Sequence, residues 1–429
     1  MYFGFISLIV TLIMLGVLVL IHEFGHFAVA KACGVRVEQF AIGFGKRLFG
    51  FRRGNTDYRV NLLPFGGYVK MSGENPLEGR TGDPAEFMSH PRWQRFLIAI
   101  AGPTMNVLLA VALMTGVFMV AHPFDAPPLV AEVQPNSPAA QAGIQAGDKI
   151  VRINGKENPN WETVLSQITL NVNQPVNLEV QRGKEVLVKK VVPVATGKDQ
   201  SGDIGVDLKS AIYVTSVQAG MPAASAGIRH GDEVLSIAGV PLRTGRDLVD
   251  RVQQSHGNPI PVVLNRGGQQ ITVNVKPVPD TSGAYKIGIG IGAEKLPFPQ
   301  ALRASVQKNE EYSGLIFELI GKLVQNRASI KQMSGPIGIG QAAGRAAFEG
   351  WLELIMVTAM ISLNLGILNL FPIPIMDGGV ILLLGIEAIM RHDISIHIKE
   401  RIYQAAFVFL VLFAAIVIYN DVVKIVPGS

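Results

Sequence analysis

The chain has 429 residues, of which 48% are hydrophobic and 17% charged, and its mean hydropathy is positive. It is too long for one ordinary domain and too apolar for a typical soluble protein. The formal net charge is only +5 and no dense Lys/Arg run carries interleaved aromatic residues, which argues against nucleic acid as a partner. The single cysteine, Cys33, excludes an intramolecular disulfide and a cysteine-based zinc site.

Four apolar runs are long enough, or nearly so, to cross the ~30 Å hydrocarbon core of a bilayer. They are residues 3–21, 96–121, 352–371 and 402–419. The first run has no basic leader and no small-residue cleavage site, so we interpret it as a retained spanning helix and not as a cleavable signal peptide.

Basic residues predict the orientation of these spans. The segment between the first two runs is rich in Lys and Arg, whereas nothing basic precedes Phe3. The positive-inside rule places that segment in the cytoplasm, and both termini and residues 122–300 outside. The loop around Arg391, Lys399 and Arg401 is also basic and falls on the cytoplasmic side, in agreement.

The residues 41–45 and 62–69 are apolar segments punctuated by glycine, inside the otherwise basic cytoplasmic loop. They could form a β-hairpin that dips into the protein at membrane depth. Irregular backbone is tolerated there only where protein or a water-filled cavity covers it.

An internal repeat occupies the exterior segment. Residues 137–150 (SPAAQAGIQAGDKI) match residues 221–234 (MPAASAGIRHGDEV), and each copy later reaches an Ile-Gly pair followed by an apolar residue, at 204–206 and 287–289. A repeat of about 80 residues has the size of a domain and not of a solenoid unit. The repeated phrase resembles the signature of PDZ domains, which implies two tandem domains with peptide grooves. A generic β-rich exterior domain is the alternative.

The residues 22–26 read His-Glu-Phe-Gly-His at the end of the first apolar run. Positions i and i+4 share one helix face, so His22 and His26 can reach one Zn²⁺, and Glu23 beside them can accept a proton from water. A carboxylate at this depth costs on the order of 2–3 kcal/mol, so we interpret it as functional. The alternative is a polar seam between packed helices.

A catalytic zinc site needs a third protein ligand, and three nearby candidates are poor. Cys33 lies roughly 10 Å beyond His26 along a helix. His392 and His397 sit in a charged loop, where we expect them to be solvated.

The better candidate is Asp377, in the segment 369–379 (NLFPIPIMDGG). Two prolines end the third apolar run and open the chain at membrane depth. Taken alone, Asp377 is equally well explained as the N-cap of a helix over 378–390. Its joint occurrence with the two histidines favours a ligand role.

Together these motifs resemble the site-2 protease family, peptidase family M50. The tandem repeat, the Gly-Pro-Thr-Met-Asn segment 102–106 and the Gly-Phe-Gly segment 43–45 resemble its bacterial regulator-of-sigma-E protease branch. Met376 stands where Leu is usual, a volume-conserving change. The resemblance covers essentially the whole chain. It implies an α-helical polytopic membrane protein with four transmembrane helices and a membrane re-entrant β-hairpin, plus two extracytoplasmic α+β PDZ domains.

The resemblance also implies residue roles. His22, His26 and Asp377 would bind Zn²⁺, and Glu23 would be the general base. Substrate contacts are implied for Asn369, Pro372, Phe65, Gly66, Gly67, Gly43, Gly45 and Asn106. Asn369 could instead cap a carbonyl freed near Pro372, and Asn106 could instead form a helix–helix hydrogen bond.

The expected organisation follows the chain from the first transmembrane helix to the fourth. It comprises helix one with the His-Glu motif (1–33), a cytoplasmic loop with the hairpin (34–95), helix two (96–121), PDZ domains (125–207 and 208–292), a linker with an amphipathic helix (293–350), helix three (351–372), the Asn/Pro/Asp loop with a cytoplasmic segment (373–400), and helix four (401–424).

The expected function is regulated intramembrane proteolysis of single-span membrane proteins. The implied location is the bacterial inner membrane, with the active site near the cytoplasmic face and the PDZ domains and both termini outside. The implied substrates are anti-sigma-factor-type proteins already cut outside, or remnant signal peptides, and the PDZ domains would bind peptides or trimmed substrate ends. A catalytically inactive membrane-anchored PDZ scaffold is disfavoured because every catalytic position is filled. An ion or metal transporter is disfavoured because the chain shows no inverted repeat.

Overall fold

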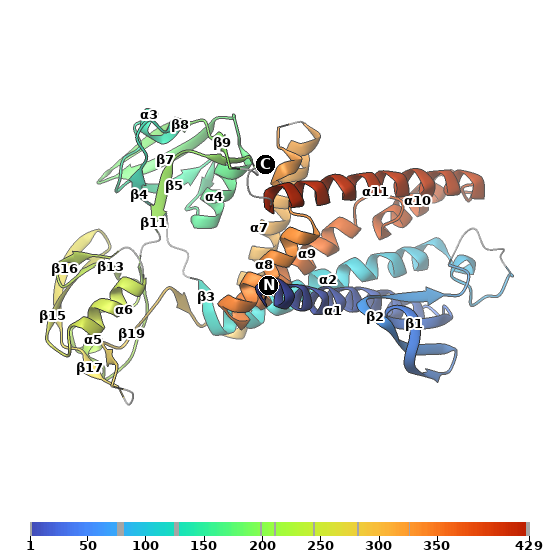
Figure 1. The fold of residues 1–429 in the computed structure, drawn as a ribbon, viewed down its shortest axis with the longest axis horizontal. Coiled ribbons are helices and arrows are strands. Elements are labelled where there is room, and N and C mark those ends of the chain that lie inside the picture. The colour runs from blue at the N-terminus through green and yellow to red at the C-terminus, as the bar shows by residue number, and fades with distance from the viewer. Residues whose placement is uncertain are drawn as a thin grey trace. The chain divides into compact units, whose positions relative to one another are not determined.

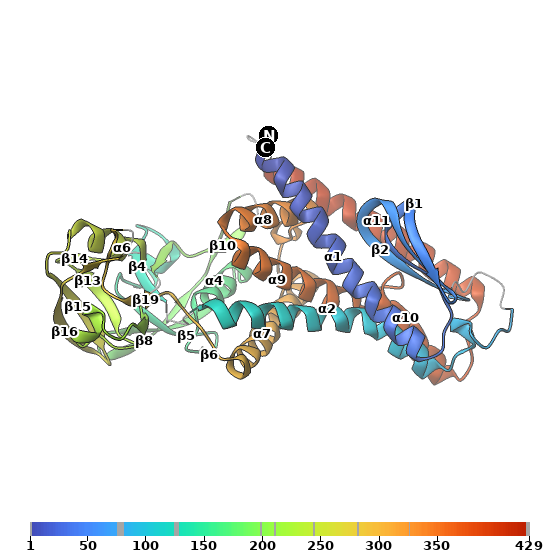
Figure 2. The same cartoon turned by 90° about the horizontal axis from the view of Figure 1, so that it is seen from below.

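The computed structural model describes residues 2–74, 81–123, 128–197, 200–209, 212–242, 245–280, 283–325 and 327–425. This chain divides into two compact units. The first comprises residues 1–117, 302–317 and 333–429, and the second comprises residues 118–301 and 318–332. In Figures 1 and 2 the first unit holds the long helices and one β-hairpin, and the second holds most of the strands.

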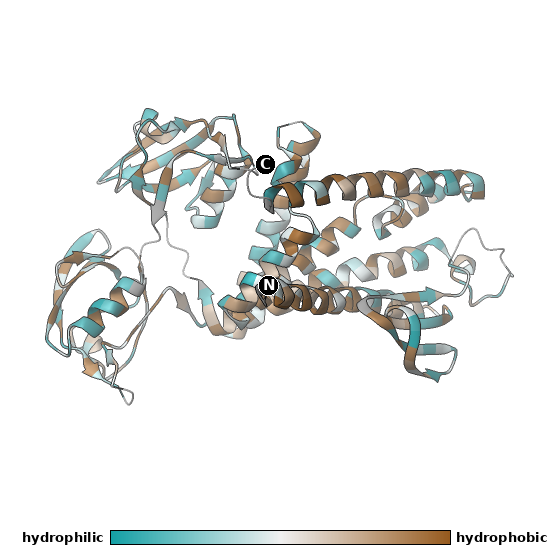
Figure 3. Ribbon diagram, in the orientation of Figure 1, coloured by the Kyte–Doolittle hydropathy of each residue, from teal (hydrophilic) through white to brown (hydrophobic). Residues whose placement is uncertain are grey.

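Long apolar helices form the first unit. Within the described residues, four helices are long and apolar enough to cross a membrane: α1 (Tyr2–Ala32), α2 (Arg92–Ala121), α9 (Trp351–Asn369) and α11 (Ile396–Ile425). They contain most of the four apolar runs of the sequence, but α1 continues well past residue 21 to Ala32 and α11 extends its run at both ends. Figure 3 shows the concentration of hydrophobic residues along them. Large side chains such as Phe407 and Leu412 on α11 are more than half exposed, as a lipid-facing surface requires.

Three further helices complete this part of the chain: α7 (Phe298–Val324), α8 (Pro336–Glu349) and α10 (Asp377–Met390). Both α7 and α8 lie in the segment for which the sequence predicted a linker with one amphipathic helix. Met14 and Leu18 of α1 form a buried cluster with Ala343 of α8. Gly344 of α8 lies so close to Ser7 of α1 that a Cβ would not fit between them. The helix α8 is therefore part of the packed core.

The start of α8 is held by α11. The buried Asp421 carboxylate accepts hydrogen bonds from the backbone N–H groups of Gly335, Ile337 and Gly338, at 2.9 to 3.0 Å. These N–H groups have no partner inside a helix, so the carboxylate satisfies them and complements the positive end of the helix dipole.

The strands β1 (Val37–Arg53) and β2 (Thr56–Met71) form an antiparallel pair. Ile42 pairs with Gly67 and Phe44 with Leu63, so the two glycine-punctuated segments of the sequence lie side by side. The close approach needs glycine, because a Cβ on Gly67 would lie 2.6 Å from the carbonyl oxygen of Ala41. The side chain of Phe65, which was expected to contact substrate, lies outside the described residues.

The second unit contains the two copies of the repeat. The first copy has a six-stranded sheet in the order β11-β4-β5-β7-β8, with β6 paired to β5. Its elements are β4 (Leu129–Val133), α3 (Pro138–Gln141), β5 (Lys149–Ile153), β6 (Lys156–Glu157), α4 (Trp161–Leu170), β7 (Val176–Arg182), β8 (Glu185–Val191), β9 (Val194–Thr196), β10 (Ser201–Asp203) and β11 (Val206–Lys209).

The second copy repeats this order of elements. It has a four-stranded sheet, β14-β13-β15-β16, and a separate pair, β12-β19. Its elements are β12 (Val214–Val217), α5 (Pro222–Ser225), β13 (Glu233–Ile237), β14 (Val240–Pro241), α6 (Gly245–Gln254), β15 (Ile260–Arg266), β16 (Gln269–Val275), β17 (Val278–Pro279), β18 (Tyr285–Lys286) and β19 (Ile289–Ile291). Each copy has its own buried apolar core.

Each copy contains one buried carboxylate bound by an arginine. Arg182 donates two hydrogen bonds to Asp148, from Nε at 2.7 Å and Nη2 at 2.8 Å. Arg266 donates two hydrogen bonds to Asp232 from the same atoms, both at 2.7 Å. Both carboxylate side chains are 1% exposed. The Gly-Asp pair of the repeated phrase is therefore a structural device common to the two copies.

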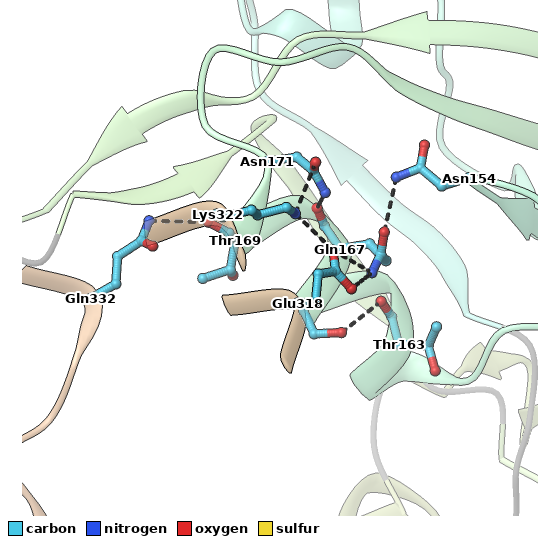
Figure 4. Close-up of polar contacts among 9 residues, drawn as sticks. Asn154, Thr163, Gln167, Thr169, Asn171, Glu318, Lys322 and Gln332 are labelled. Atoms are coloured by element: carbon cyan, nitrogen blue, oxygen red, sulfur yellow. Dashed lines mark hydrogen bonds and ion pairs between the residues drawn. The ribbon is translucent and has the colours of Figure 1, made fainter. Parts of the chain in front are cut away.

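The helix α4 of the first copy also makes polar contacts with the end of α7 (Figure 4). Gln167 donates to Glu318 at 3.0 Å and accepts from Asn154 at 2.9 Å. Lys322 donates to Glu318 at 2.7 Å and to Asn171 at 3.1 Å. Gln167 and Asn171 are buried, so these hydrogen bonds satisfy groups that water does not reach.

Candidate metal centre and active site

Two imidazoles and one carboxylate meet in the first unit. His22 and His26 lie one turn apart on α1, and Asp377 is the first residue of α10. His22 Nε2 is 3.1 Å from Asp377 Oδ2, and His26 Nε2 is 3.4 Å from Asp377 Oδ1. The two Nε2 atoms are 3.2 Å apart. Across the described ranges, this is the one group of three such ligands whose donor atoms all lie within 4.8 Å.

The local sequence explains why Asp377 lies here. Pro372 and Pro374 cannot continue α9, and the turn that follows folds over the start of α10. A Cβ on Gly378 or Gly379 would collide with main-chain atoms of this turn, so the two glycines permit the fold. The N-cap of α10 is Met376, and Asp377 occupies the next position. The alternative prediction of Asp377 as the N-cap is therefore wrong, and its carboxylate lies beside the imidazoles.

The far nitrogen of each imidazole meets a polar group of α2. His26 Nδ1 lies 2.7 Å from the carbonyl oxygen of Ile98, so this nitrogen carries the proton and donates. His22 Nδ1 lies 3.3 Å from Nδ2 of Asn106. A carbonyl that accepts from Nδ1–H leaves the lone pair of Nε2 free, which is the usual arrangement around a histidine that binds metal.

The helix α2 faces the cluster with its backbone. A Cβ on Gly102 would collide with Nε2 of His26 and would lie 2.8 Å from Nε2 of His22. A Cβ on Gly25, inside the histidine motif, would collide with the carbonyl oxygen of Ala101. The space around the two Nε2 atoms is thus kept open by glycine. Two imidazoles, one carboxylate and this space fit a zinc ion with a coordination position left for chemistry.

Glu23 is held by the β-hairpin. Its Oε2 accepts a hydrogen bond from the backbone N–H of Val69 in β2, at 2.9 Å. Glu23 is half-buried and adjacent in sequence to His22. The hairpin therefore orients the carboxylate beside the imidazoles, which is the position that a general base requires.

A cavity of about 120 Å³ adjoins these groups, enough for several water molecules. Its wall includes Glu23 and Asp377, apolar residues such as Val69, and the ion pair between Glu387 and Lys399. Lys399 Nζ lies 2.6 Å from Glu387 Oε1, and both side chains are less than a tenth exposed. The cavity combines a polar end at the cluster with an apolar wall.

Among the residues whose side chains the structure describes, those that the resemblance assigned to substrate do not line this cavity. Gly43 accepts a hydrogen bond from the buried Asn61, at 2.9 Å, through its carbonyl oxygen. Asn369 is half-buried in the last turn of α9, and Pro372 is exposed. Among the described residues, Asn106 is the member of the predicted substrate set that contacts the metal cluster.

Sequence reasoning missed four contributors to the site: the N–H of Val69, the carbonyl of Ile98, Glu387 and Lys399. The two backbone groups carry no signal in the sequence. Glu387 does, because it is a single acidic residue in the apolar stretch of α10. The loop histidines His392 and His397 are exposed.

Comparison with known families identifies the chain. The model of peptidase family M50 matches residues 10–413. The chain belongs to peptidase family M50. It is 32% identical to the "Regulator of sigma-E protease RseP" of Salmonella typhimurium, over 96% of this chain and 97% of that protein. It is 32% identical to the protein of the same name from Escherichia coli, with the same coverage. It is 33% identical to a "Putative zinc metalloprotease" of Vibrio cholerae, over 98% and 99% of the two chains.

This chain is accordingly a zinc metalloprotease related to RseP. Its sheet-rich middle region also has PDZ domains among its structural neighbours. The PDZ domain of the SdrC-like protein Lmo2051 from Listeria monocytogenes is 24% identical and covers 19% of this chain and 86% of that one, with a TM-score of 0.18. The second domain of the Listeria protein Lin2157 is 27% identical over 19% and 82%, also with a TM-score of 0.18.

Proposed function

We propose that this metalloprotease cuts single-span membrane proteins inside or beside the bilayer. The observation that carries the proposal is the position of the cluster: His22, Glu23 and His26 lie on a helix long and apolar enough to span a membrane. Charged and polar groups are costly at that depth, so a protein retains them mainly where they serve a function. The basic residues of the sequence favour a site near the cytoplasmic face of the membrane, with the repeat and both termini outside. The RseP relatives of Salmonella and Escherichia coli favour a bacterial inner membrane.

His22, His26 and Asp377 would hold the zinc ion, which when bound supplies Lewis-acid polarisation of a carbonyl and makes water a stronger acid. Glu23 accepts the proton of the attacking water and returns it to the leaving amine. The N–H of Val69 holds the carboxylate in place for both transfers. The cavity beside Glu23 supplies room for water within an apolar surrounding.

The substrate helix has to unwind before it is cut, because intrahelical hydrogen bonds shield its carbonyl groups. The edge of β2 near residues 65–69 offers backbone groups with which an extended segment can pair. Support comes from the hydrogen bond between Val69 and Glu23, which places this strand next to the general base. Asn369 and Pro372, close in sequence to Asp377, would contact the same segment.

The two repeat copies would act as PDZ domains that select substrates. In the second copy, a cavity of about 400 Å³ lies between α6 and the residues 285–290, and it includes the Ile287-Gly288-Ile289 segment. A groove between a helix and an edge strand suits a peptide or a trimmed substrate end. Since relatives are named regulators of sigma-E, we propose anti-sigma-factor-type proteins as substrates, with remnant signal peptides as a second group.

The decisive variant is Glu23→Gln, tested on a tagged single-span membrane protein shortened on its exterior side and co-expressed with the full-length protease. Glutamine keeps the size of the side chain but cannot accept the proton. We expect cleavage to fall by about 10²–10⁴-fold. Glu353→Gln, which changes an exposed carboxylate on α9, is the matched control and should cleave like wild type. Cleavage retained by Glu23→Gln would contradict the mechanism, and no cleavage by any form would favour the scaffold alternative.

A further inference from the structure

Asn106 is the buried polar group of the site whose role is least explained by the proposed mechanism. It lies on α2, is 1% exposed and points its side-chain amide at His22. Its backbone carbonyl accepts a hydrogen bond from Ser362 of α9, at 2.8 Å, which fixes the residue between helices. A side chain enclosed in this way is poorly placed to reach a substrate.

The two atoms of the Asn106 amide are in different situations. Nδ2 lies 3.3 Å from Nδ1 of His22, whereas Oδ1 is buried and has no hydrogen-bond partner among the described residues. A buried acceptor without a partner is unfavourable, because it has lost its hydrogen bond to water without gaining another. Rotation of the amide by 180° exchanges the two atoms without moving anything else, and the choice between them rests on the hydrogen-bond network.

The rest of the cluster decides that choice. The Nε2 atoms of His22 and His26 both face the Asp377 carboxylate, so each needs its lone pair there to bind a metal. His22 must then carry its proton on Nδ1 and donate it. The rotated amide offers Oδ1 to that proton, which matches the way that the Ile98 carbonyl accepts from Nδ1 of His26.

We propose that Asn106 is a positioning residue: its side-chain oxygen accepts the Nδ1–H of His22 and thereby fixes the tautomer and ring orientation that bind zinc. This inference rests on the metal site of the proposed function. It assigns Asn106 to the protease's own ligand and not to the substrate. Outer partners of this kind typically change metal affinity by about 10- to 100-fold.

The test measures zinc retention by the purified full-length protein in detergent, titrated with a chelator, and does not depend on cleavage. Asn106→Leu keeps the volume and removes the acceptor, so zinc affinity should fall by about 10- to 100-fold. Asn106→Asp offers only acceptor oxygens and should retain zinc like wild type. If the amide donated its N–H to His22 instead, aspartate would fail as badly as leucine.

Asn309→Leu is the matched control for the loss of a buried amide. Asn309 lies on α7, is 5% exposed and also has an Oδ1 without a partner among the described residues, and it contacts Met114 and Ser305. It should retain zinc fully, and a thermal melt of each variant separates misfolding from loss of metal. Full retention by Asn106→Leu, or loss in Asn106→Asp equal to that in Asn106→Leu, would overturn the proposal. Absence of zinc from the wild type would overturn the metal site itself.

Discussion

The two copies of the repeat share their element order and differ in the contacts that their helices α4 and α6 make. Alignment of the segments Ile204-Gly205-Val206 and Ile287-Gly288-Ile289 places Gly202 of the first copy opposite Tyr285 of the second. Gly202 lies against the carbonyl of Ile168 on α4, with no space for a Cβ between them. Tyr285 instead bonds through its backbone to the side chain of Gln253 on α6, and a cavity of about 400 Å³ opens there.

The outer side of each helix differs as well. In the first copy Gln167 and Asn171 of α4 are engaged by Glu318 and Lys322 of α7. At the position of Gln167 the second copy has Arg251, which contacts Gln254 at the surface. In the first copy, helix α4 is therefore held by contacts on two sides. In the second copy, helix α6 borders a cavity. We expect the second copy to be the one that binds peptide.

The largest effect on stability should come from placing a side chain where only glycine fits. Gly202→Tyr forces a ring into the contact between β10 and α4, and we expect it to destabilise the first copy by about 3 kcal/mol. Hydrogen exchange of the full-length protein, followed separately in each copy, measures the effect. Ala195→Tyr adds the same side chain to the exposed partner of Gly202 on β9 and should leave exchange unchanged. Equal exchange in the two variants would show that the close packing is not needed.

A smaller and symmetrical effect is expected at the shared ion pair. Asp148→Ala and Asp232→Ala should each destabilise their own copy by about 2 kcal/mol, since each removes a buried acceptor of two arginine hydrogen bonds. Asp250→Ala, at an exposed position on α6, is the control. Unequal losses in the two copies would show that the two ion pairs are not equivalent.

The same carboxylates predict a pH dependence. Burial alone would raise the pKa of Asp148, but hydrogen bonds from Arg182 and from the N–H of Gln145 outweigh it and the pKa is lowered. The hydrogen bond from Arg266 lowers the pKa of Asp232. A lowered pKa contributes stability above the unfolded value of about 3.9 and loses it as the pH falls through the folded value. Both copies should lose part of their stability as the pH falls below about 4, and the alanine variants should lack this dependence.

The smallest change in stability is expected at the position where the two helices differ in their contacts. Gln167→Leu removes hydrogen bonds to Glu318 and Asn154, and we expect a loss of about 1 kcal/mol in the first copy. The counterpart Arg251→Leu should change the second copy by less than about 0.5 kcal/mol. Urea titration of the full-length protein, read out by exchange in each copy, compares them. A larger loss of stability for Arg251→Leu than for Gln167→Leu would contradict the idea that the contacts with α7 stabilise helix α4.

The sequence predicted those parts of the fold that depend on local pattern. Long apolar runs predict the four long helices, and the repeated Gly-Asp phrase predicts the two domain-sized copies of the repeat. The helix α8 was missed because Gly338, Gly340 and Gly344 disfavour an isolated helix, whereas packing on α1 requires small residues. The bulged register between β1 and β2 likewise depends on tertiary contacts.

The residues of the metal site also differ in how far the sequence alone could predict them. The spacing of His22 and His26 is a local pattern, so the sequence predicts it. Asp377 became a candidate only through its joint occurrence with them. The contacts of Glu23 with Val69 and of His26 with Ile98 use backbone atoms, which any residue type supplies. No pattern of side chains could have predicted them.

Two glycines of the metal centre allow helix backbone to lie close to the imidazoles. At Gly25 and Gly102 the main chains of α1 and α2 come together, so helix backbone lies close to one side of the imidazole pair. A substrate carbonyl would therefore have to approach from a side that this backbone leaves open, and Glu23 and Asp377 line the adjoining cavity. The helix backbones thus limit the directions from which the metal position can be approached.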